Sequence, residues 1–145
     1  MPAIMRSMNV IARCAAIYRT QQIELDGLLG VHHSYILVIV NHPGMSQDWL
    51  AKHLCLSKSN VTRHLACLEK QGYVERRASE ADKREMLVYP TEKMNEIYPE
   101  VLRVTHEWNA LISEGFSEEE LEGFGRLIEK MLDRSLDLIG REGLK

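Results

Sequence analysis

The sequence lacks the long apolar segments and paired cysteines that mark membrane and secreted proteins. Its central apolar run, Ile36–Val40, is far shorter than the ~20 residues that a membrane-spanning helix needs. Arg6 and Arg13 interrupt the N-terminal segment, which argues against a signal peptide. The three cysteines are odd in number and do not have the spacing of a zinc finger. We therefore expect a cytoplasmic protein with no membrane partner.

Recognisable catalytic machinery is also missing. No nucleophile, base and orienting group stand in a known arrangement, and there is no glycine-rich phosphate loop. We therefore expect neither an enzyme nor a bound cofactor. The chain has 145 residues, of which 45% are hydrophobic, so it can form one domain with a sizeable core and is not intrinsically disordered.

The net charge of −3 hides an uneven distribution of charge along the chain. Residues 51–84 carry eight basic and four acidic side chains, whereas residues 85–145 carry seven basic and fourteen acidic ones. One basic segment in an otherwise neutral or acidic chain is typical of a localised site for a polyanion. Chance clustering on a solvated surface is the other interpretation that charge alone allows.

Helical patterns occupy both ends of the chain. Residues 4–26 have apolar side chains every three or four positions, which predicts a helix, and residues 33–41 predict a short buried helix. Beyond the basic segment, Pro90–Thr91 begin a helix of about 23 residues. Ser117–Glu120 form a capping box that begins a last amphipathic helix.

The middle of the chain predicts two helices joined by a tight turn. Ser46 caps the first, which ends near Leu54, and Ser57 caps the second, which ends near Gln71. In a helix-turn-helix, the second helix lies in the DNA major groove while the first crosses the backbone. Cys55 occupies the turn, where glycine is common. Besides Ser46, the residues whose hydroxyl, amide and cationic groups suit base edges and phosphates are Ser57, Lys58, Ser59, Asn60, Thr62 and Arg63.

Two short β-prone segments, residues 73–77 and 86–89, follow the second helix and predict a hairpin with a charged tip. Such a wing can place cationic side chains along the adjacent minor groove. An ion pair with Asp82 would hold the side chain of Arg84 in place. The candidate DNA-binding residues of this hairpin are Arg76, Arg77, Asp82, Lys83 and Arg84. An ordinary solvated loop tip is the alternative.

On these residues the sequence resembles the MarR family of winged-helix regulators. The segments that carry the resemblance are 46–51, 57–63, 68–76 and the wing motif Asp82-Lys83-Arg84, followed by Leu87 and Thr91. The chain departs from the family pattern at His32–Tyr35 and at Met94–Asn95, which border the region of the family's effector cavity.

The resemblance implies a mainly α fold with a small β-hairpin wing in a single domain, residues 1–145. Residues 31–91 would form the winged helix-turn-helix, and residues 1–30 and 92–145 would form flanking dimerisation helices. It further implies a homodimeric repressor or activator that binds a palindromic operator in double-stranded DNA. A small molecule, metal or oxidant usually modulates such binding, and the identity of any effector stays open.

Burial also predicts a dimer, because terminal helices with wide apolar stripes need a partner to cover them. The candidate interface residues are Ile4, Met8, Ile11, Phe124, Leu127, Ile128, Met131 and Leu132. The alternative is that the first and last helices cover each other within one chain.

Two other functional interpretations remain. A winged helix can bind protein rather than DNA, although such a module does not need a cationic wing. A metal- or oxidant-sensing member of the family is the other. A metal site would draw on His32, His33, His42 and His106 with Glu24, but polar surface histidines fit better, so no metal is expected. Cys14 lies beside Arg13, and a small core residue is the favoured interpretation over an oxidant sensor.

Overall fold

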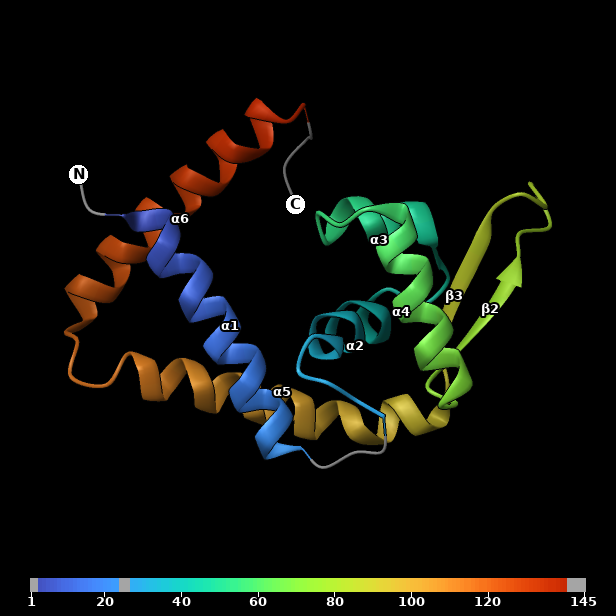
Figure 1. The fold of residues 1–145 in the computed structure, drawn as a ribbon, viewed down its shortest axis with the longest axis horizontal. Coiled ribbons are helices and arrows are strands. Elements are labelled where there is room, and N and C mark those ends of the chain that lie inside the picture. The colour runs from blue at the N-terminus through green and yellow to red at the C-terminus, as the bar shows by residue number, and fades with distance from the viewer. Residues whose placement is uncertain (1–2, 24–26, 141–145) are drawn as a thin grey trace. The chain divides into compact units, whose positions relative to one another are not determined.

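A computed structural model describes residues 3–23 and 27–140 of the chain. Its elements, all but β1 labelled in Figure 1, are α1 (Ile4–Gln22), α2 (His32–Asn41), β1 (Met45–Ser46), α3 (Gln47–His53), α4 (Lys58–Lys70), β2 (Val74–Ala78), β3 (Met86–Pro90), α5 (Glu92–Ile112) and α6 (Glu118–Leu138). They form two compact units, Met1–Trp108 and Asn109–Lys145, and the boundary falls within α5. The prediction of a mainly α fold with a small β-hairpin is confirmed.

The helix boundaries follow the sequence patterns closely. Ser46 and Ser57 accept hydrogen bonds from the backbone N–H groups of Trp49 and Asn60, so both predicted N-caps are present. The first helix ends at Gln22, earlier than the predicted residue 26, and residues 24–26 of that prediction lie outside the described residues.

The sheet has three antiparallel strands in the order β1-β3-β2. In the predicted hairpin, Arg76 of β2 pairs with Val88 of β3. The sequence did not predict β1, in which Met45 pairs with the same Val88 from the other side. β1 is only two residues long, too short for any alternation of apolar and polar side chains to be recognised.

The core of the first unit lies where the short helices meet the sheet and α5. Thr91, just before α5, donates a hydrogen bond from its hydroxyl to the carbonyl of Gly72 at 2.6 Å, which ties the start of α5 to the end of α4. The fully buried core side chains include Tyr35, Ile36, Ile39, Leu50, Val61, Leu65, Leu68, Val88, Met94, Val101 and Val104.

The turn between α3 and α4 is tight and strained at one residue. Cys55 has a φ of 53°, and no other non-glycine residue of the described part has a positive φ. An L-residue in this left-handed region carries a conformational cost that glycine avoids. The N–H of Leu56 donates to the carbonyl of Ala51 at 3.0 Å, which closes the turn. The position that departs from glycine in the sequence is therefore the position that needs left-handed backbone.

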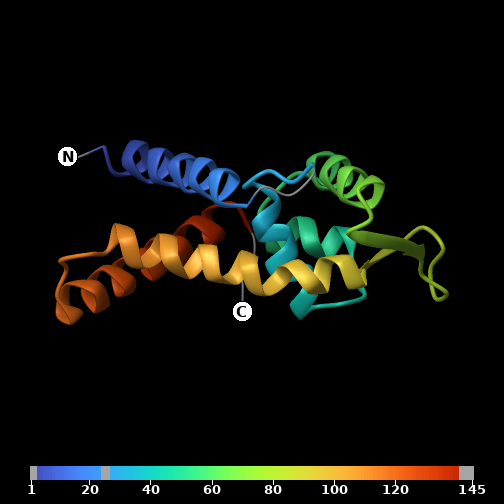
Figure 2. The ribbon, with the colours of Figure 1, turned by 90° about the horizontal axis from the view of Figure 1, so that it is seen from below.

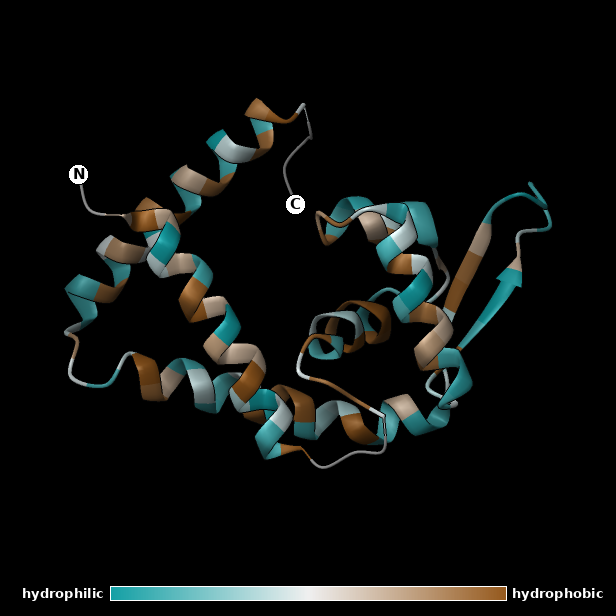
Figure 3. Ribbon diagram, in the orientation of Figure 1, coloured by the Kyte–Doolittle hydropathy of each residue, from teal (hydrophilic) through white to brown (hydrophobic). Residues whose placement is uncertain are grey.

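The second unit consists of the end of α5 and α6. Ser117 and Glu120 form the predicted capping box at the start of α6. Only Leu136 of α6 is buried, although the helix is strongly amphipathic. In Figure 3, hydrophobic bands run along α6, and also along α1 of the first unit. None of the helices described is long and apolar enough to cross a membrane.

Candidate nucleic-acid interface

The first turns of α4 present a polar surface built on a buried anchor. Val61, Leu65 and Leu68 face the core and have no exposed area, so the opposite face of the helix is fixed outward. Five of the six candidates on that face are exposed and Asn60 is half-buried; the six are Ser57, Lys58, Ser59, Asn60, Thr62 and Arg63. Ser57 also serves as the N-cap, through a hydrogen bond of 3.2 Å from the N–H of Asn60.

Hydrogen bonds arrange these side chains before any ligand binds. Arg63 donates from Nη2 to Oδ1 of Asn60 at 3.1 Å, so a guanidinium and an amide lie side by side. Lys58 Nζ lies 2.8 Å from Oδ2 of Asp48 on α3, but both side chains are largely exposed, so the pair is readily exchanged for another anion. The result is a row of donors on one helix face.

The wing, defined as residues 74–90, projects beyond α4 in Figure 2. At its tip, Asp82 Oδ1 accepts from the backbone N–H of Arg84 at 3.0 Å and lies 3.5 Å from its Nε. The Arg84 side chain is nevertheless 94% exposed. Asp82 therefore shapes the turn and directs Arg84 without covering it, as the sequence predicted. Lys83 beside it is also exposed.

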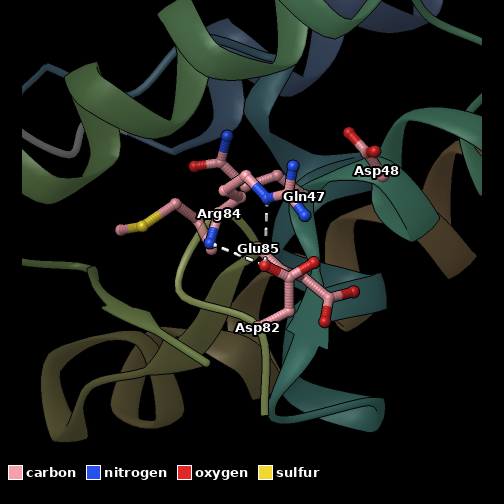
Figure 4. A pocket seen from close by; sticks show the side chains of 6 residues that line it. Gln47, Asp48, Asp82, Arg84 and Glu85 are labelled. Carbon is pink, nitrogen blue, oxygen red and sulfur yellow. Dashed lines mark hydrogen bonds and ion pairs between the residues drawn. The ribbon is translucent and has the colours of Figure 1, made fainter. Parts of the chain in front are cut away.

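A polar hollow of about 330 Å³ lies between the wing tip and the start of α3. Gln47 and Asp48 face it from α3, and Asp82, Arg84 and Glu85 face it from the wing (Figure 4). The hollow joins the tip of the wing to the helix-turn-helix, so the two parts form one continuous polar surface.

Arg76 and Arg77 have different surroundings from Arg84. Arg76 donates to Glu69 from Nη2 at 2.9 Å and from its backbone N–H at 3.0 Å, and its side chain is only 18% exposed. The hydrogen bond from Arg76 lowers the pKa of the Glu69 carboxyl. Arg77 pairs with Glu75 at 2.7 Å and its guanidinium lies 4.6 Å from the centre of the Tyr89 ring. Arg76 is thus engaged within the protein, and Arg77 remains on the surface.

Gln47 is a structural residue of this surface that the sequence analysis missed. Its Oε1 accepts from Nη1 of Arg76 at 3.2 Å, and its Nε2 donates to Oγ1 of Thr62 at 3.4 Å. It therefore links the first residue of α3 to both the wing and α4.

The expectation that the histidines are polar surface residues is wrong for two of them. His32 and His33 are 2% and 3% exposed, whereas His42 and His106 are exposed as predicted. His32 contacts His64 of α4 instead of the other histidines of the proposed metal cluster. In the described residues no three His, Cys, Asp or Glu side chains are close enough to hold a metal ion, and Glu24 lies outside them.

Cys14 is also misplaced by the sequence analysis. It is exposed on α1 rather than packed in the core of the chain.

The predicted interface residues of the terminal helices are exposed or half-exposed in the single chain. On α1 these are Ile4, Met8 and Ile11, and on α6 they are Phe124, Leu127, Ile128, Met131 and Leu132.

The comparisons with known proteins agree with this geometry. The family model for the MarR family matches residues 26–85. The HTH-type transcriptional regulator YybA of Bacillus subtilis is 28% identical over 129 residues, which cover 88% of this chain and 85% of YybA.

Solved structures have the same fold over nearly the whole chain. A SlyA-like transcription regulator from Listeria monocytogenes superposes with a TM-score of 0.89 at 24% identity, covering 99% of both chains. A MarR family regulator from Listeria monocytogenes complexed with a 26mer DNA superposes with a TM-score of 0.85 at 24% identity, again covering 99% of both chains. The helix-turn-helix, the wing and the flanking helices therefore recur in the same order in these structures, and residues 26–85 of the chain are similar to the MarR family.

Proposed function

We propose that the chain is a homodimeric, sequence-specific regulator of transcription that binds a palindromic operator. The observation that carries the proposal is the pairing of an outward row of donors on α4 with the 94%-exposed Arg84 at the wing tip. Hydroxyl, amide and guanidinium groups at the start of a helix suit base edges in the major groove. An arginine on a neighbouring hairpin suits the negative potential of the minor groove.

Different residues of this surface have different tasks. Asn60 and Arg63, held together at 3.1 Å, form a donor–acceptor unit that can pair with base edges, which gives sequence preference. Lys58, Arg77, Lys83 and Arg84 supply positive charge for phosphates, which gives affinity. Arg76 belongs to neither group, because Glu69 and Gln47 occupy it; it holds the base of the wing against α3 and α4.

The palindrome follows from the dimer. Two recognition helices related by a two-fold axis meet two half-sites about 34 Å apart, one turn of the DNA. The exposed apolar faces of α1 and α6 supply the surface through which two chains associate. An effector that changes the separation of the two α4 helices then weakens contact with one half-site, which is a coupling between two sites on one assembly. The proposal needs no catalytic step and places the protein in the cytoplasm with the DNA.

The test begins with DNA duplexes selected from a random pool by the full-length protein. We expect a palindromic motif and an affinity that falls steeply with salt. Arg84→Ala should lower the slope of log K against log salt by about one unit, because one phosphate contact is lost. Arg126→Ala on α6 removes the same charge from an exposed side chain and should leave the slope unchanged. Equal slopes for the two variants would exclude the wing from the interface.

A second measurement separates sequence reading from charge. Arg63→Ala and Asn60→Ala should reduce the preference for the selected duplex over a scrambled one by about 1–3 kcal/mol. Lys58→Ala should weaken both duplexes alike. If the chain selects no motif and binds neither duplex, the winged helix binds another class of partner. In a separate experiment, thermal-shift measurements with phenolic compounds, divalent metals and peroxide would search for the effector.

A further inference from the structure

The start of α2 is unusual because it buries two imidazole rings at the edge of an apolar helix. α2 has the sequence HHSYILVIVN, and its first two residues, His32 and His33, are almost fully buried. Burial of a polar ring is costly unless its nitrogens find partners. His32 has partners on both sides, and one of them lies in α4.

The hydrogen bonds of His32 determine which nitrogen carries the proton. The backbone N–H of Leu29 donates to Nδ1 of His32 at 3.1 Å, so Nδ1 must be an unprotonated acceptor. The proton of the neutral ring is then on Nε2, which lies 3.1 Å from Nδ1 of His64. Nε2 of His32 therefore donates to His64, and the network assigns both rings as neutral.

Tyr35 completes a small aromatic cluster around this contact. The His32 and His64 rings meet edge to face at 5.1 Å and 76°, and the Tyr35 ring lies 5.4 Å from His64 and 6.5 Å from His32. Tyr35 is fully buried, and its hydroxyl has no hydrogen-bond partner. The contact is thus packed on one side, and His64 itself is half-buried.

Burial, and then nearby positive groups, oppose protonation of these rings. Burial and then the neighbouring His64 ring lower the pKa of His32 to about 4. Burial and then Arg63 lower the pKa of His64. The pKa of His33, the neighbour of His32, is lowered to about 4 by burial and then by Arg19 of α1 and by His32. Burial raises the pKa of Tyr35 to about 12, so its hydroxyl stays neutral.

The same turn is also anchored on α1. The N–H of Gly30 donates to Oγ1 of Thr20 at 2.6 Å. A Cβ atom at Gly30 would lie 1.9 Å from the carbonyl oxygen of Ala16, so the turn is pressed against α1. Leu29, which holds Nδ1 of His32, is the neighbour of Gly30. One continuous set of contacts therefore runs from α1 through His32 to His64, the residue after Arg63 in α4.

We propose that His32 and His64 are positioning residues of the recognition helix, and that acid releases α4 because protonation of either ring removes the acceptor of one hydrogen bond in this chain of contacts. This inference rests on the proposed function. A proton on Nδ1 of His64 would face the Nε2 proton of His32, which leaves two donors and no acceptor. A proton on Nδ1 of His32 would face the N–H of Leu29. Either event removes a fixed point of α4 directly beside Arg63.

Acid favours the released arrangement because a freed imidazole regains its ordinary affinity for protons. Loss of the contact lets α4 move relative to α2, and base contacts weaken steeply once donor and acceptor separate beyond hydrogen-bond distance. Acid would strengthen DNA binding if the protonated His64 stayed in place, because its positive charge near the DNA would add to the attraction for phosphates.

The test measures the affinity of the full-length dimer for its selected duplex between about pH 7.5 and about pH 5, where we expect the wild-type affinity to fall by about tenfold. Ionic strength is held constant, and circular dichroism at each pH confirms that the protein is folded. His64→Asn keeps an uncharged acceptor for His32 and should flatten the pH profile. His64→Leu has no acceptor and should bind more weakly than His64→Asn at the higher pH. His106→Asn, a change at an exposed histidine of α5, should retain the wild-type profile.

A profile that His64→Asn leaves unchanged, or an affinity that rises with acid through His64, overturns the inference. A readout without DNA keeps it separate from the proposed function. Nitrogen NMR of the imidazole rings should show the Nε2–H tautomer for both His32 and His64 at neutral pH. It should also show the two rings titrating together in acid. Failure to bind any duplex with this NMR signature intact would overturn the proposed function alone, whereas an Nδ1–H tautomer for His32 would overturn the histidine contact itself.

Discussion

Helices α4 and α6 have similar amphipathic sequences but different surroundings. Each has apolar residues spaced by three and four, and each begins at a serine cap. In α4 the apolar face is completely covered, since Val61, Leu65 and Leu68 have no exposed area. In α6, Phe124 is 62% exposed and Leu127 is 63% exposed.

The difference shows that an apolar stripe predicts burial but does not identify the surface that packs against it. The stripe of α4 is covered by the core of its own unit. A row of exposed large apolar side chains such as that on α6 is typical of an association surface. The partner of the α4 stripe therefore lies within the chain, and we propose a second chain as the partner of the α6 stripe.

The largest expected effect comes from a charge on the exposed stripe of α6. Leu127→Glu would place an unpaired charge in an apolar interface, at a cost of several kcal/mol. We expect a monomer or an unfolded protein, with loss of operator binding although α4 is unchanged. Lys130→Gln changes the net charge equally on the same helix and should stay dimeric. Analytical ultracentrifugation decides, and a folded Leu127→Glu dimer with normal affinity would place the interface elsewhere.

A cavity beneath α4 should have a smaller effect, and it should change the free energy of unfolding instead of the oligomeric state. Leu65→Ala removes buried methyl groups from the core and should lower the free energy of unfolding by about 2–5 kcal/mol. Leu29→Ala makes the same change at a side chain that is 55% exposed and lies outside both stripes, and it should cost less than about 1 kcal/mol. Urea unfolding at a fixed protein concentration measures both. Similar losses for the two variants would contradict the burial of the α4 stripe.

Acid should weaken the packed unit through His33. Its pKa of about 4 is below that of an unfolded histidine, so the unfolded chain binds the proton more tightly. The contribution of the neutral His33 ring to the free energy of unfolding is therefore fully present above about pH 6.5. It declines by about 2–3 kcal/mol as the pH falls toward about 4. His33→Gln should reduce the decline, and His42→Gln should not. Urea unfolding at several pH values tests it, and an undiminished decline in His33→Gln would assign the effect to other groups.

The smallest effect is expected at the turn before α4. Cys55 adopts a left-handed backbone with a φ of 53°, which glycine adopts without strain. Cys55→Gly should raise the free energy of unfolding by at most about 1 kcal/mol, because the greater freedom of glycine in the unfolded chain offsets part of the gain. Cys55→Ala keeps the strain and serves as the control. A clear loss of stability in Cys55→Gly would show that the thiol makes a contact that matters more than the backbone.

Local chemistry explains which parts of the fold were predictable. The Ser57 cap, the left-handed Gly72 after α4 and the Ser117 capping box each depend on residues within four positions of one another. The wing was predictable for the same reason, because its two strands are neighbours in the chain. The placement of the candidate residues on α4 and the wing was predictable too, since these elements are consecutive in the chain, and their contacts with DNA stay a prediction.

The features that sequence reasoning missed depend on residues far apart in the chain. The partner of His32 lies 32 residues away, and the partner of Arg76 in α3 lies 29 residues away. No spacing rule connects them, so the sequence alone predicts neither the burial of His32 nor the contact of Arg76 with Gln47. Burial of His32 had one available signal, because it directly precedes the apolar run of α2.

The junction at Ser46 cannot accept an additional residue without a change in the neighbouring structure. Ser46 pairs with Leu87 as the last residue of β1 and also caps α3, which begins at the next residue. An inserted residue there would have to shift either the strand register or the start of the helix-turn-helix, and a one-residue shift in a strand turns every side chain to the opposite face. The tip of the wing, by contrast, can lengthen without disturbing either pairing. Inserted residues should therefore be tolerated at residues 80–81, ahead of the Asp82–Arg84 turn, and not at residues 45–47.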